Sequence, residues 1–500
     1  MLPSSLIKDD YIRNLFIASI LTFCAFFMVK TLKKIILGFV LQTSNKGVSV
    51  ELVKNYELSR DTNMLEYSYA IQMAKDSARI QSDVTDIVLG PSLFQEMKLF
   101  PQSIMNDMKP TYKFYPDHRS IAIRLEGTRY GQIINAILMK NIEMVLQDRE
   151  ILIDQTLSLN VQTQYFSDSE IIHINDVHTF IAGTLADVET LFCYGELTRN
   201  NSKLNDAINN LILSPNSFSE SSIKELYKLR KLRNMLKIKR SHDYLCDLIK
   251  KEIIASSKKE SILSKNNILE LIVQNETLLE ESLESINFGF MSFVTCSIKY
   301  MWHQISNLII DISMNEHTYK KLIHEQKYLI KKYGNIFTRK ILDKMKYLDA
   351  AFLESMRLSG AGECLRMSEK DIFLSNGSKV QKSSVVKLSK FLYGNAINVH
   401  PPNPYGFWPE RHLLTSNNLS KVSDKNVAWG VGWKTCPYYM YASLSMKLFA
   451  AIFFRKYKIL FDRNNTAPQH QGYIFGEVAF HNKSDLNIKI CDILDGGFDD

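Results

Sequence analysis

Helical periodicity runs through the middle of the chain and constrains its fold more than any other feature. Apolar residues recur there every three or four positions, which is the spacing of a helix that buries one face. Six segments show this spacing: 130–146, 174–192, 223–253, 268–285, 288–312 and 317–332. Strand-like runs are short and lie at 372–374, 385–388 and 456–461. The sequence therefore predicts a mainly α fold with small β-sheets.

Composition and charge exclude several classes of protein. Lys and Arg total 61 against 53 Asp and Glu, and this excess of +8 is spread along the chain. We therefore expect no nucleic-acid partner, whereas an acidic protein or an anionic membrane surface would suit the charge. The seven cysteines have no zinc-site spacing, and their odd number argues against a disulfide framework. Most should be buried thiols in a reducing compartment.

The N-terminus carries an apolar run at 15–29, followed by Lys30, Lys33 and Lys34 and by further apolar residues at 35–40. It lacks the leading charges and small-residue cleavage site of a secretory signal. Basic residues after the run favour a cytosolic location for the rest of the chain. We predict a single-pass membrane anchor at 1–40 and one domain at 41–500; a buried helix and a cleaved signal are the alternatives.

A glycine-rich segment at 429–437 carries the strongest local motif. Gly430 and Gly432 allow a tight loop whose backbone approaches a flat ligand closely. A helix is predicted to begin at Pro437, so that Cys436 lies at a helix N-terminus, which favours a thiolate. Lys434 adds a positive charge suited to a carboxylate. On its own, the segment is also explained by a capped helix with a buried thiol, so both interpretations stay open here.

Two further motifs precede this loop. Glu354 and Arg357 lie three residues apart on the predicted helix 346–358, a spacing that taken alone indicates an ordinary surface ion pair. Arg411 ends the proline-rich segment 402–411, which should be extended.

The order Glu354-x-x-Arg357, then Pro-Glu-Arg411, then a glycine-rich loop ending in Cys436-Pro437 resembles the cytochrome P450 family. The resemblance implies that family's fold, as a single catalytic domain behind an N-terminal transmembrane helix. It implies haem b, with Cys436 as the axial thiolate ligand of the iron. It also implies that Glu354, Arg357 and Arg411 form a buried ionic cluster with a structural role.

The same resemblance assigns the other cofactor-binding residues. Lys434 is similar in position to the family's propionate-binding basic residue, and Arg366 to an arginine that reaches a propionate. Trp429 stands where the family has an aromatic residue at the start of the haem loop. Thr295 resembles the catalytic hydroxyl of the family's long central helix, which organises water near the oxygen substrate.

Segments 191–200 and 292–297 resemble fungal enzymes of secondary metabolism, with indole-diterpene oxidation as the nearest subgroup. The resemblance implies a monooxygenase that oxidises a lipophilic small molecule with O2. Its electrons would come from NADPH through an NADPH–cytochrome reductase. The protein would lie in a membrane, the endoplasmic reticulum, with the catalytic domain in the cytosol.

Some residues depart from the family pattern. Val294 replaces the acid that usually precedes the threonine, Met291 and Ser292 replace a small pair, and Tyr438 replaces a glycine. Three alternatives stay open, and these departures favour the first two. The alternatives are a haem-thiolate isomerase or dehydratase, a catalytically impaired member acting as a membrane-anchored binding protein, and an anchored helical protein that binds a partner without haem.

Overall fold

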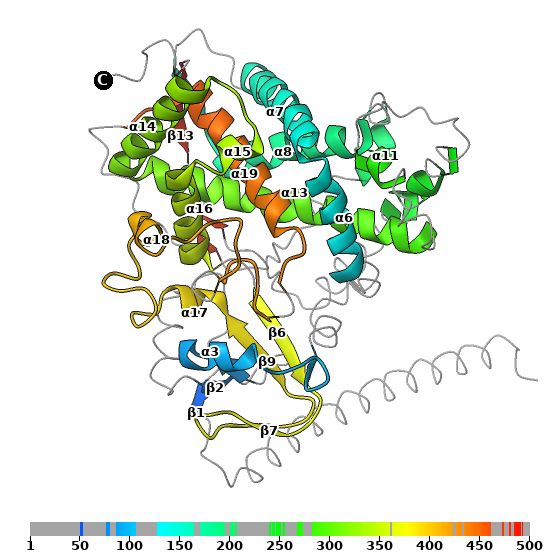
Figure 1. Ribbon diagram of the computed structural model, residues 1–500, viewed down its shortest axis with the longest axis vertical. Coiled ribbons are helices and arrows are strands. Elements are labelled where there is room, and N and C mark those ends of the chain that lie inside the picture. Colours follow the sequence, from blue (N-terminus) through cyan, green and yellow to red (C-terminus); the bar gives the residue numbers. More distant parts are fainter. Residues whose placement is uncertain are drawn as a thin grey trace, which may run out of the picture.

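The computed structural model describes the greater part of the chain. The residues described are 51–53, 77–80, 87–106, 128–164, 171–195, 201–204, 206–207, 240–241, 243–245, 247–251, 254–255, 268–273, 283–360, 363–423, 427–432, 435–461, 473–474, 480–481, 485–491 and 493. They form a large helical part and, below it in Figure 1, a smaller part built on a β-sheet. The predicted mainly α architecture with small sheets is confirmed.

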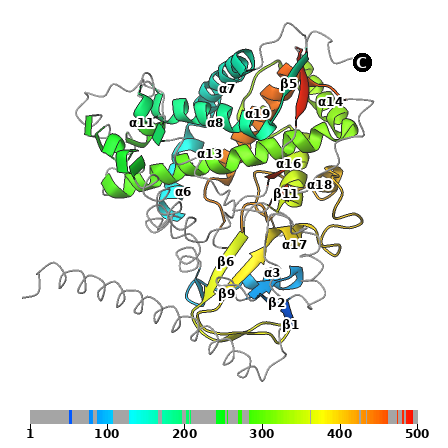
Figure 2. The same ribbon diagram turned by 180° about the vertical axis from the view of Figure 1, so that it is seen from behind.

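The helical part is organised around α13 (Leu283–Ser313), whose 31 residues span about 46 Å at the usual rise per residue. Figure 2 shows α13 crossing the whole helical part. The other helices here are α6 (Thr128–Lys140), α7 (Ile142–Gln164), α8 (Val177–Tyr194), α11 (Ile268–Val273), α14 (Glu316–Tyr333), α15 (Arg339–Leu342), α16 (Lys346–Ser359) and α19 (Tyr439–Lys456).

Local side-chain chemistry sets where several of these helices begin and end. Asp176 caps α8 by accepting hydrogen bonds from the N–H groups of His178 and Thr179, and Gly360 ends α16 in the left-handed conformation. The single helix predicted at 130–146 is wrong, because the chain turns at Asn141 between α6 and α7. The Asn141 amide donates to the Ile137 carbonyl and competes with regular helix there.

The sheet part contains a six-stranded mixed sheet in the order β1-β2-β3-β9-β6-β4. β3 pairs with β9 in parallel, and β9 pairs with β6 antiparallel. The bounds are β1 (Glu51–Val53), β2 (Ser77–Ile80), β3 (Ile87–Leu89), β4 (Met105–Asn106), β6 (Glu363–Ser368) and β9 (Val385–Ser389). The short helices α3 (Pro91–Met97), α17 (Lys390–Gly394) and α18 (Glu410–Leu414) follow strands or loops of this part.

Three smaller sheets complete the described structure. A three-stranded sheet joins β10 (Tyr457–Ile459), which follows α19 directly, to β13 (Leu486–Ile490) and β5 (Ile171–Ile174). The others are hairpins of two strands each: β7 (Ile372–Phe373) with β8 (Lys379–Val380), and β11 (Tyr473–Ile474) with β12 (Phe480–His481). The predicted strands at 372–374, 385–388 and 456–461 correspond to β7, β9 and β10, whereas β5 falls before the predicted helix 174–192.

Two hydrophobic cores meet at the loop that precedes α19. The larger core fills the helical part and includes Trp429, with Cys436 packed against it. The smaller core lies between the six-stranded sheet and α3, and it includes Val431. The loop before α19 therefore contacts both cores, and a functional site here would be formed by the helical part and the sheet part together.

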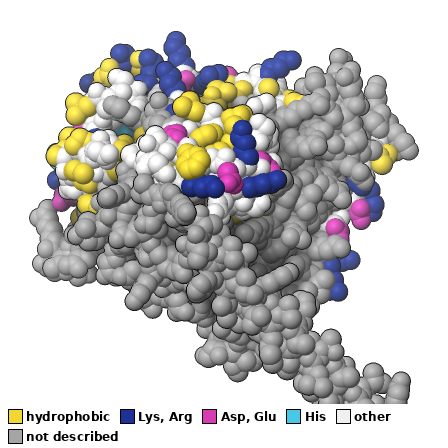
Figure 3. All heavy atoms as spheres, turned by 90° about the horizontal axis from the view of Figure 1, so that it is seen from below, with side chains coloured by type: hydrophobic (Ala, Val, Ile, Leu, Met, Phe, Trp, Pro, Cys, Tyr) yellow, Lys and Arg dark blue, Asp and Glu magenta, His cyan; other side chains and the backbone are white. Residues whose placement is uncertain are grey.

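The predicted anchor at 1–40 lies outside the described residues. Within the described part, no helix combines the length and the apolar character that crossing a membrane requires. At the sheet end of the molecule, Leu99 and Phe373 are 81% and 66% exposed. Figure 3 shows hydrophobic and basic side chains lying side by side on this end.

Candidate functional site

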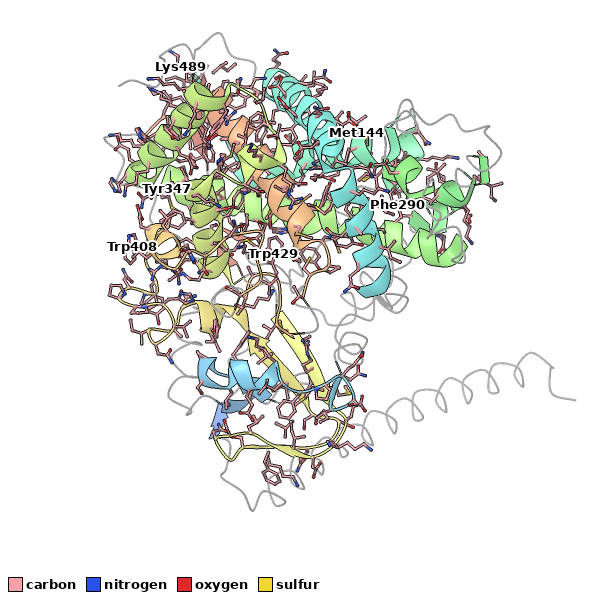
Figure 4. The ribbon with its side chains drawn as sticks, viewed as in Figure 1. Met144, Phe290, Tyr347, Trp408, Trp429 and Lys489 are labelled. Carbon is pink, nitrogen blue, oxygen red and sulfur yellow. The ribbon has the colours of Figure 1, made fainter. Side chains whose placement is uncertain are left out.

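The loop before α19 is closed by its own backbone and by one indole. The Cys436 N–H donates to the Trp429 carbonyl over 2.7 Å, and the Trp429 Nε1–H donates to the Leu419 carbonyl over 2.7 Å. Gly430 (φ 101°) and Gly432 (φ 68°) take left-handed conformations that favour glycine. Figure 4 shows Trp429 just below α19. The helix begins at Tyr439 rather than at the predicted Pro437, because residues 437 and 438 form a turn.

The surroundings of the Cys436 thiol act on its pKa in opposite directions. Burial raises its pKa, whereas the N–H of Tyr438 and the positive charge of Lys390 lower it, and the net pKa is raised. Lys390 is fixed nearby because its ammonium donates to the Ala428 carbonyl over 2.8 Å. The thiol therefore stays protonated at neutral pH unless a cation lies against the sulfur.

Tyr438, at the position where the resemblance led us to expect a glycine, finds room against α6 and α13. Its ring meets the Phe293 ring of α13 at a centroid distance of 5.3 Å. On the other side lies Gly131 of α6, where a Cβ atom would be 2.7 Å from Pro437 Cγ and 3.4 Å from the Tyr438 hydroxyl. A glycine on α6 thus leaves space for the Pro437 ring, which precedes Tyr438 in the turn after Cys436.

We therefore expect Gly131→Ala to destabilise the fold by about 1–3 kcal/mol, although alanine is the better helix former. The added methyl would push Pro437 away from α6 and disturb the turn after Cys436. Gly183→Ala in α8 is the matched control, because a Cβ there meets no atom within 4 Å. Thermal unfolding should separate the two variants. A Gly131→Ala variant as stable as the wild type, or more stable, would contradict this packing.

A buried ionic cluster lies on α16, around Glu354. Arg357 holds both carboxylate oxygens, with Nε–Oε2 and Nη2–Oε1 distances of 2.8 Å. Arg411 Nε donates to Glu354 Oε1 over 3.0 Å, and the Trp408 N–H donates to the same oxygen over 2.9 Å. Glu354 is completely buried. The structure thus brings together the three residues proposed for this cluster, with a backbone donor in addition.

The two arginines also fasten the chain that leads to the cysteine loop. Arg357 donates to the carbonyls of Gly394, Pro404 and Gly406. Arg411 donates to the carbonyls of His400, Pro401 and Asn403. These bonds fix the irregular segment 394–411 against α16, so the cluster organises loop backbone as well as balancing charge.

His412 belongs to the same cluster, and sequence reasoning missed it. Its Nε2 lies 2.9 Å from Glu354 Oε2, while the Asn417 amide lies 3.4 Å from its Nδ1. Burial lowers the pKa of His412, Arg357 and Arg411 lower it further, and Glu354 opposes them. A neutral ring that donates from Nε2 to Glu354 satisfies this arrangement. The position directly after Arg411 was the available signal.

The cluster should make the stability of the protein depend on pH in the acid range. Burial raises the pKa of Glu354, but hydrogen bonds from Arg357 and His412, with the positive charge of Arg357, lower it from 4.5 to about 2. Because the folded pKa lies below the ordinary one, ionised Glu354 adds about 3 kcal/mol to stability above pH 4.5, and this is lost as pH falls toward 2. In urea unfolding, Glu354→Gln should lose less stability between about pH 5 and pH 3 than the wild type. Parallel losses would contradict this role.

The remaining predicted site residues have different outcomes. Arg366, on β6, is buried and donates to the Val431 carbonyl of the cysteine loop over 3.4 Å. Thr295 lies on α13, with its side chain outside the described residues. Lys434 lies outside them entirely. Two residues after Thr295, the Ser297 hydroxyl donates to the Val294 carbonyl over 3.0 Å, which is a local contact the sequence did not indicate.

The residues present fit a haem-thiolate centre. Cys436 offers a half-buried thiol whose ionised form is favoured by a nearby cation, and iron would supply one. The glycines of the loop present no side chain where the backbone would approach a ring. The buried Arg366 is tied to the same loop and could reach an anionic group of the cofactor.

Comparison with known proteins agrees with this geometry. The family model for cytochrome P450 matches residues 140–484. Cytochrome P450 monooxygenase idtP of Claviceps paspali is 23% identical over 48% of this chain and 49% of its own length. Cytochrome P450 704C1 of Pinus taeda is 24% identical over 42% of this chain and 40% of its own. The chain thus aligns with half or less of the length of these relatives.

Solved structures show the same fold. The heme domain of cytochrome P450DA superposes with a TM-score of 0.68 at 12% identity, covering 89% of this chain and 98% of that one. A triple mutant of that domain gives a TM-score of 0.66 at 13% identity, with the same coverage of both chains. The chain belongs to the cytochrome P450 family. The resemblance to this family that the sequence motifs indicated is confirmed, and so is the family's mainly helical fold with small sheets.

Proposed function

We propose that the protein is a haem-dependent monooxygenase in which Cys436 is the axial thiolate ligand of the iron. The observation that carries this proposal is the backbone bond from Cys436 to Trp429, which closes the loop around a half-buried cysteine, together with the Glu354 cluster that holds the preceding chain in place. Membership of the cytochrome P450 family supports haem iron as the cofactor. A haem with a proximal thiolate supplies oxygen activation, since the thiolate's electron donation favours O–O cleavage.

Other residues of the chain would bind and orient the cofactor. Lys434 and Arg366 would bind propionates, and the Arg366 contact with the Val431 carbonyl supports this role. Trp429 would lie against the haem as part of the loop wall. Glu354, Arg357 and Arg411 would act structurally, by holding the segment before the loop in place.

The substrate, the electron source and the membrane belong to the same proposal. Electrons would come from NADPH through an NADPH–cytochrome reductase, and the substrate would be a lipophilic small molecule. A fungal secondary metabolite such as an indole-diterpene is the proposed class, and the similarity to a fungal monooxygenase supports it. Residues 1–40 would anchor the domain at 41–500 to the endoplasmic reticulum, with the domain in the cytosol.

The proposal is tested by reconstituting the full chain with a reductase, NADPH and lipophilic candidate substrates in membranes. Oxygen and NADPH should be consumed together, with one oxygen atom entering the product. Product formation without NADPH or reductase would instead identify a haem-thiolate isomerase or dehydratase, an alternative that the atypical residues before Thr295 favour. Haem binding without turnover of any kind would support the binding-protein alternative.

Thr295→Ala should lower the coupling of NADPH oxidation to product by roughly tenfold or more, since positioned proton-transfer groups contribute about 10²–10⁴-fold. The proposed reason is that its hydroxyl holds water on the oxygen side of the haem. Ser297→Ala is the matched control, because the Ser297 hydroxyl is already engaged by the Val294 carbonyl. The readout is the yield of product and of hydrogen peroxide per NADPH. Unchanged coupling in Thr295→Ala would remove the hydroxyl from the mechanism.

A further inference from the structure

A second buried ion pair lies away from the Glu354 cluster, between three helices. Arg149 of α7 and Glu189 of α8 are both completely buried, and Arg149 Nη2 donates to Glu189 Oε1. The other terminal nitrogen, Nη1, donates over 2.8 Å to the hydroxyl of Tyr441 in α19. The guanidinium also lies 4.9 Å from the Phe192 ring centroid. Arg149 therefore joins α7, α8 and α19 through one side chain.

The charges of this group are fixed by their surroundings. Burial lowers the pKa of Arg149, but Glu189 and Tyr441 raise it, and the net pKa is raised. Burial raises the pKa of Tyr441 well above its ordinary value. Tyr441 is therefore a neutral phenol whose oxygen accepts a charge-assisted hydrogen bond, the stronger class of such bonds. Rotation of its ring would break this bond.

Tyr441 connects the ion pair to the cysteine loop through a series of ring contacts. Its ring meets Phe293 of α13 at a centroid distance of 5.3 Å, and Phe293 meets Tyr438 at the same distance. The Tyr438 N–H in turn bonds to the Cys436 sulfur. A continuous chain of contacts thus runs from Arg149 through three aromatic rings to the residue whose N–H bonds to the thiol.

We infer that the Arg149–Glu189 pair positions the Cys436 thiolate by holding Tyr441 and, through Phe293, the turn at Tyr438. Arg149, Glu189 and Tyr441 are positioning residues, since none of them touches the sulfur. This inference rests on the proposed haem-thiolate function.

Stability alone gives a weak reason for such a pair. Replacing both members of a buried ion pair with groups of similar size is often neutral or stabilising. Within the described part of the chain, Arg149 Nε and Glu189 Oε2 lack hydrogen-bond partners, so the pair is an imperfect stabiliser. The hydrogen bond from Arg149 to Tyr441 is the contact that connects the pair to the residues around the cysteine loop.

The same helix carries a matched control pair. Lys447 of α19 is completely buried, and its ammonium lies 2.9 Å from Asp349 of α16 and donates to the Leu342 carbonyl. Lys447 lies eleven positions after Cys436, about 16 Å along a helix. Loss of this pair should therefore cost similar stability without reaching the loop.

The test compares Arg149→Met/Glu189→Gln with Lys447→Met/Asp349→Asn in the full-length protein with haem. Each sample is reduced under carbon monoxide, and the long-wavelength Soret band of thiolate-bound haem is measured against the shorter-wavelength band of haem without thiolate. The ratio of the two forms should fall roughly tenfold in the Arg149 variant alone, as loss of a charge-assisted hydrogen bond implies. The rate of haem loss should rise in parallel. Tyr441→Phe, which keeps the ring and removes the acceptor, should change the ratio in the same direction and serves if the double variant does not fold.

Equal ratios in wild type and Tyr441→Phe, or equal falls in both ion-pair variants, would overturn the inference and leave the proposed function standing. A wild-type protein without the thiolate band would refute the proposed function, and the inference with it.

Discussion

Replacing Glu354 by alanine is expected to destabilise the protein by about 3–5 kcal/mol, which is the usual cost of removing one partner from a buried ion pair. Two arginines and the Trp408 N–H would lose the acceptor they share, at a position without solvent access. Since the unfolding free energy of a domain is only about 5–15 kcal/mol, this loss removes a large share of it, and both the thermal midpoint and the yield of folded protein should fall. The measurement is the yield of soluble, haem-containing protein together with its thermal midpoint.

The control is Glu316→Ala. Glu316 forms an exposed ion pair with Lys320, four residues on in α14, at 2.8 Å. Such surface pairs contribute about 0.3–0.5 kcal/mol, so this variant should behave almost as the wild type. A Glu354→Ala variant as stable as Glu316→Ala would show that the cluster does not hold segment 394–411 in place.

Cys436→Ser is expected to abolish monooxygenase activity, with a loss well beyond the roughly 10–100-fold that removal of an outer-shell partner causes at metal sites. A serine hydroxyl is similar in shape to the thiol and somewhat smaller, but it gives no thiolate, so it cannot supply the same electron donation to the iron. Folding should be little affected, because the loop is closed by backbone bonds that serine retains. Activity is measured with reductase and NADPH, and folding by thermal unfolding.

Cys491→Ser is the matched control, since Cys491 is also half-buried and has no disulfide. It should keep full activity. Activity retained in Cys436→Ser, or lost equally in both variants, would contradict the assignment of Cys436 as the iron ligand.

The sequence predicts the helices well and the long-range pairing poorly. The 3.6-residue periodicity at 288–312 and 317–332 correctly indicated α13 and α14, and α14 buries one face of its surface as that pattern implies. It could not indicate that β5 pairs with β13, more than 300 positions away, since both strands have only four or five residues. It also merged α6 with α7, because the side-chain bond of Asn141 leaves no mark in a hydrophobic pattern.

The sequence motifs identified the main residues of the candidate site, but they did not identify the residues that contact them. Glu354, Arg357 and Arg411 meet in space, as the family resemblance implied, whereas His412 was missed although it directly follows Arg411. Arg149 and Glu189 lie 40 positions apart on separate helices, and nothing in their local spacing distinguishes them from surface charges. Nor did the sequence indicate that Gly131 of α6 leaves space for Pro437, or that the Tyr438 ring packs against Phe293.

The central claim is that Cys436 ligates a haem iron through its thiolate. The most direct test is to reduce the purified full-length protein under carbon monoxide and record the Soret band. We predict the long-wavelength band of a thiolate-bound haem in the wild type and its absence in Cys436→Ser. Haem absorbance without that band in the wild type, or the same band in both proteins, would contradict the claim.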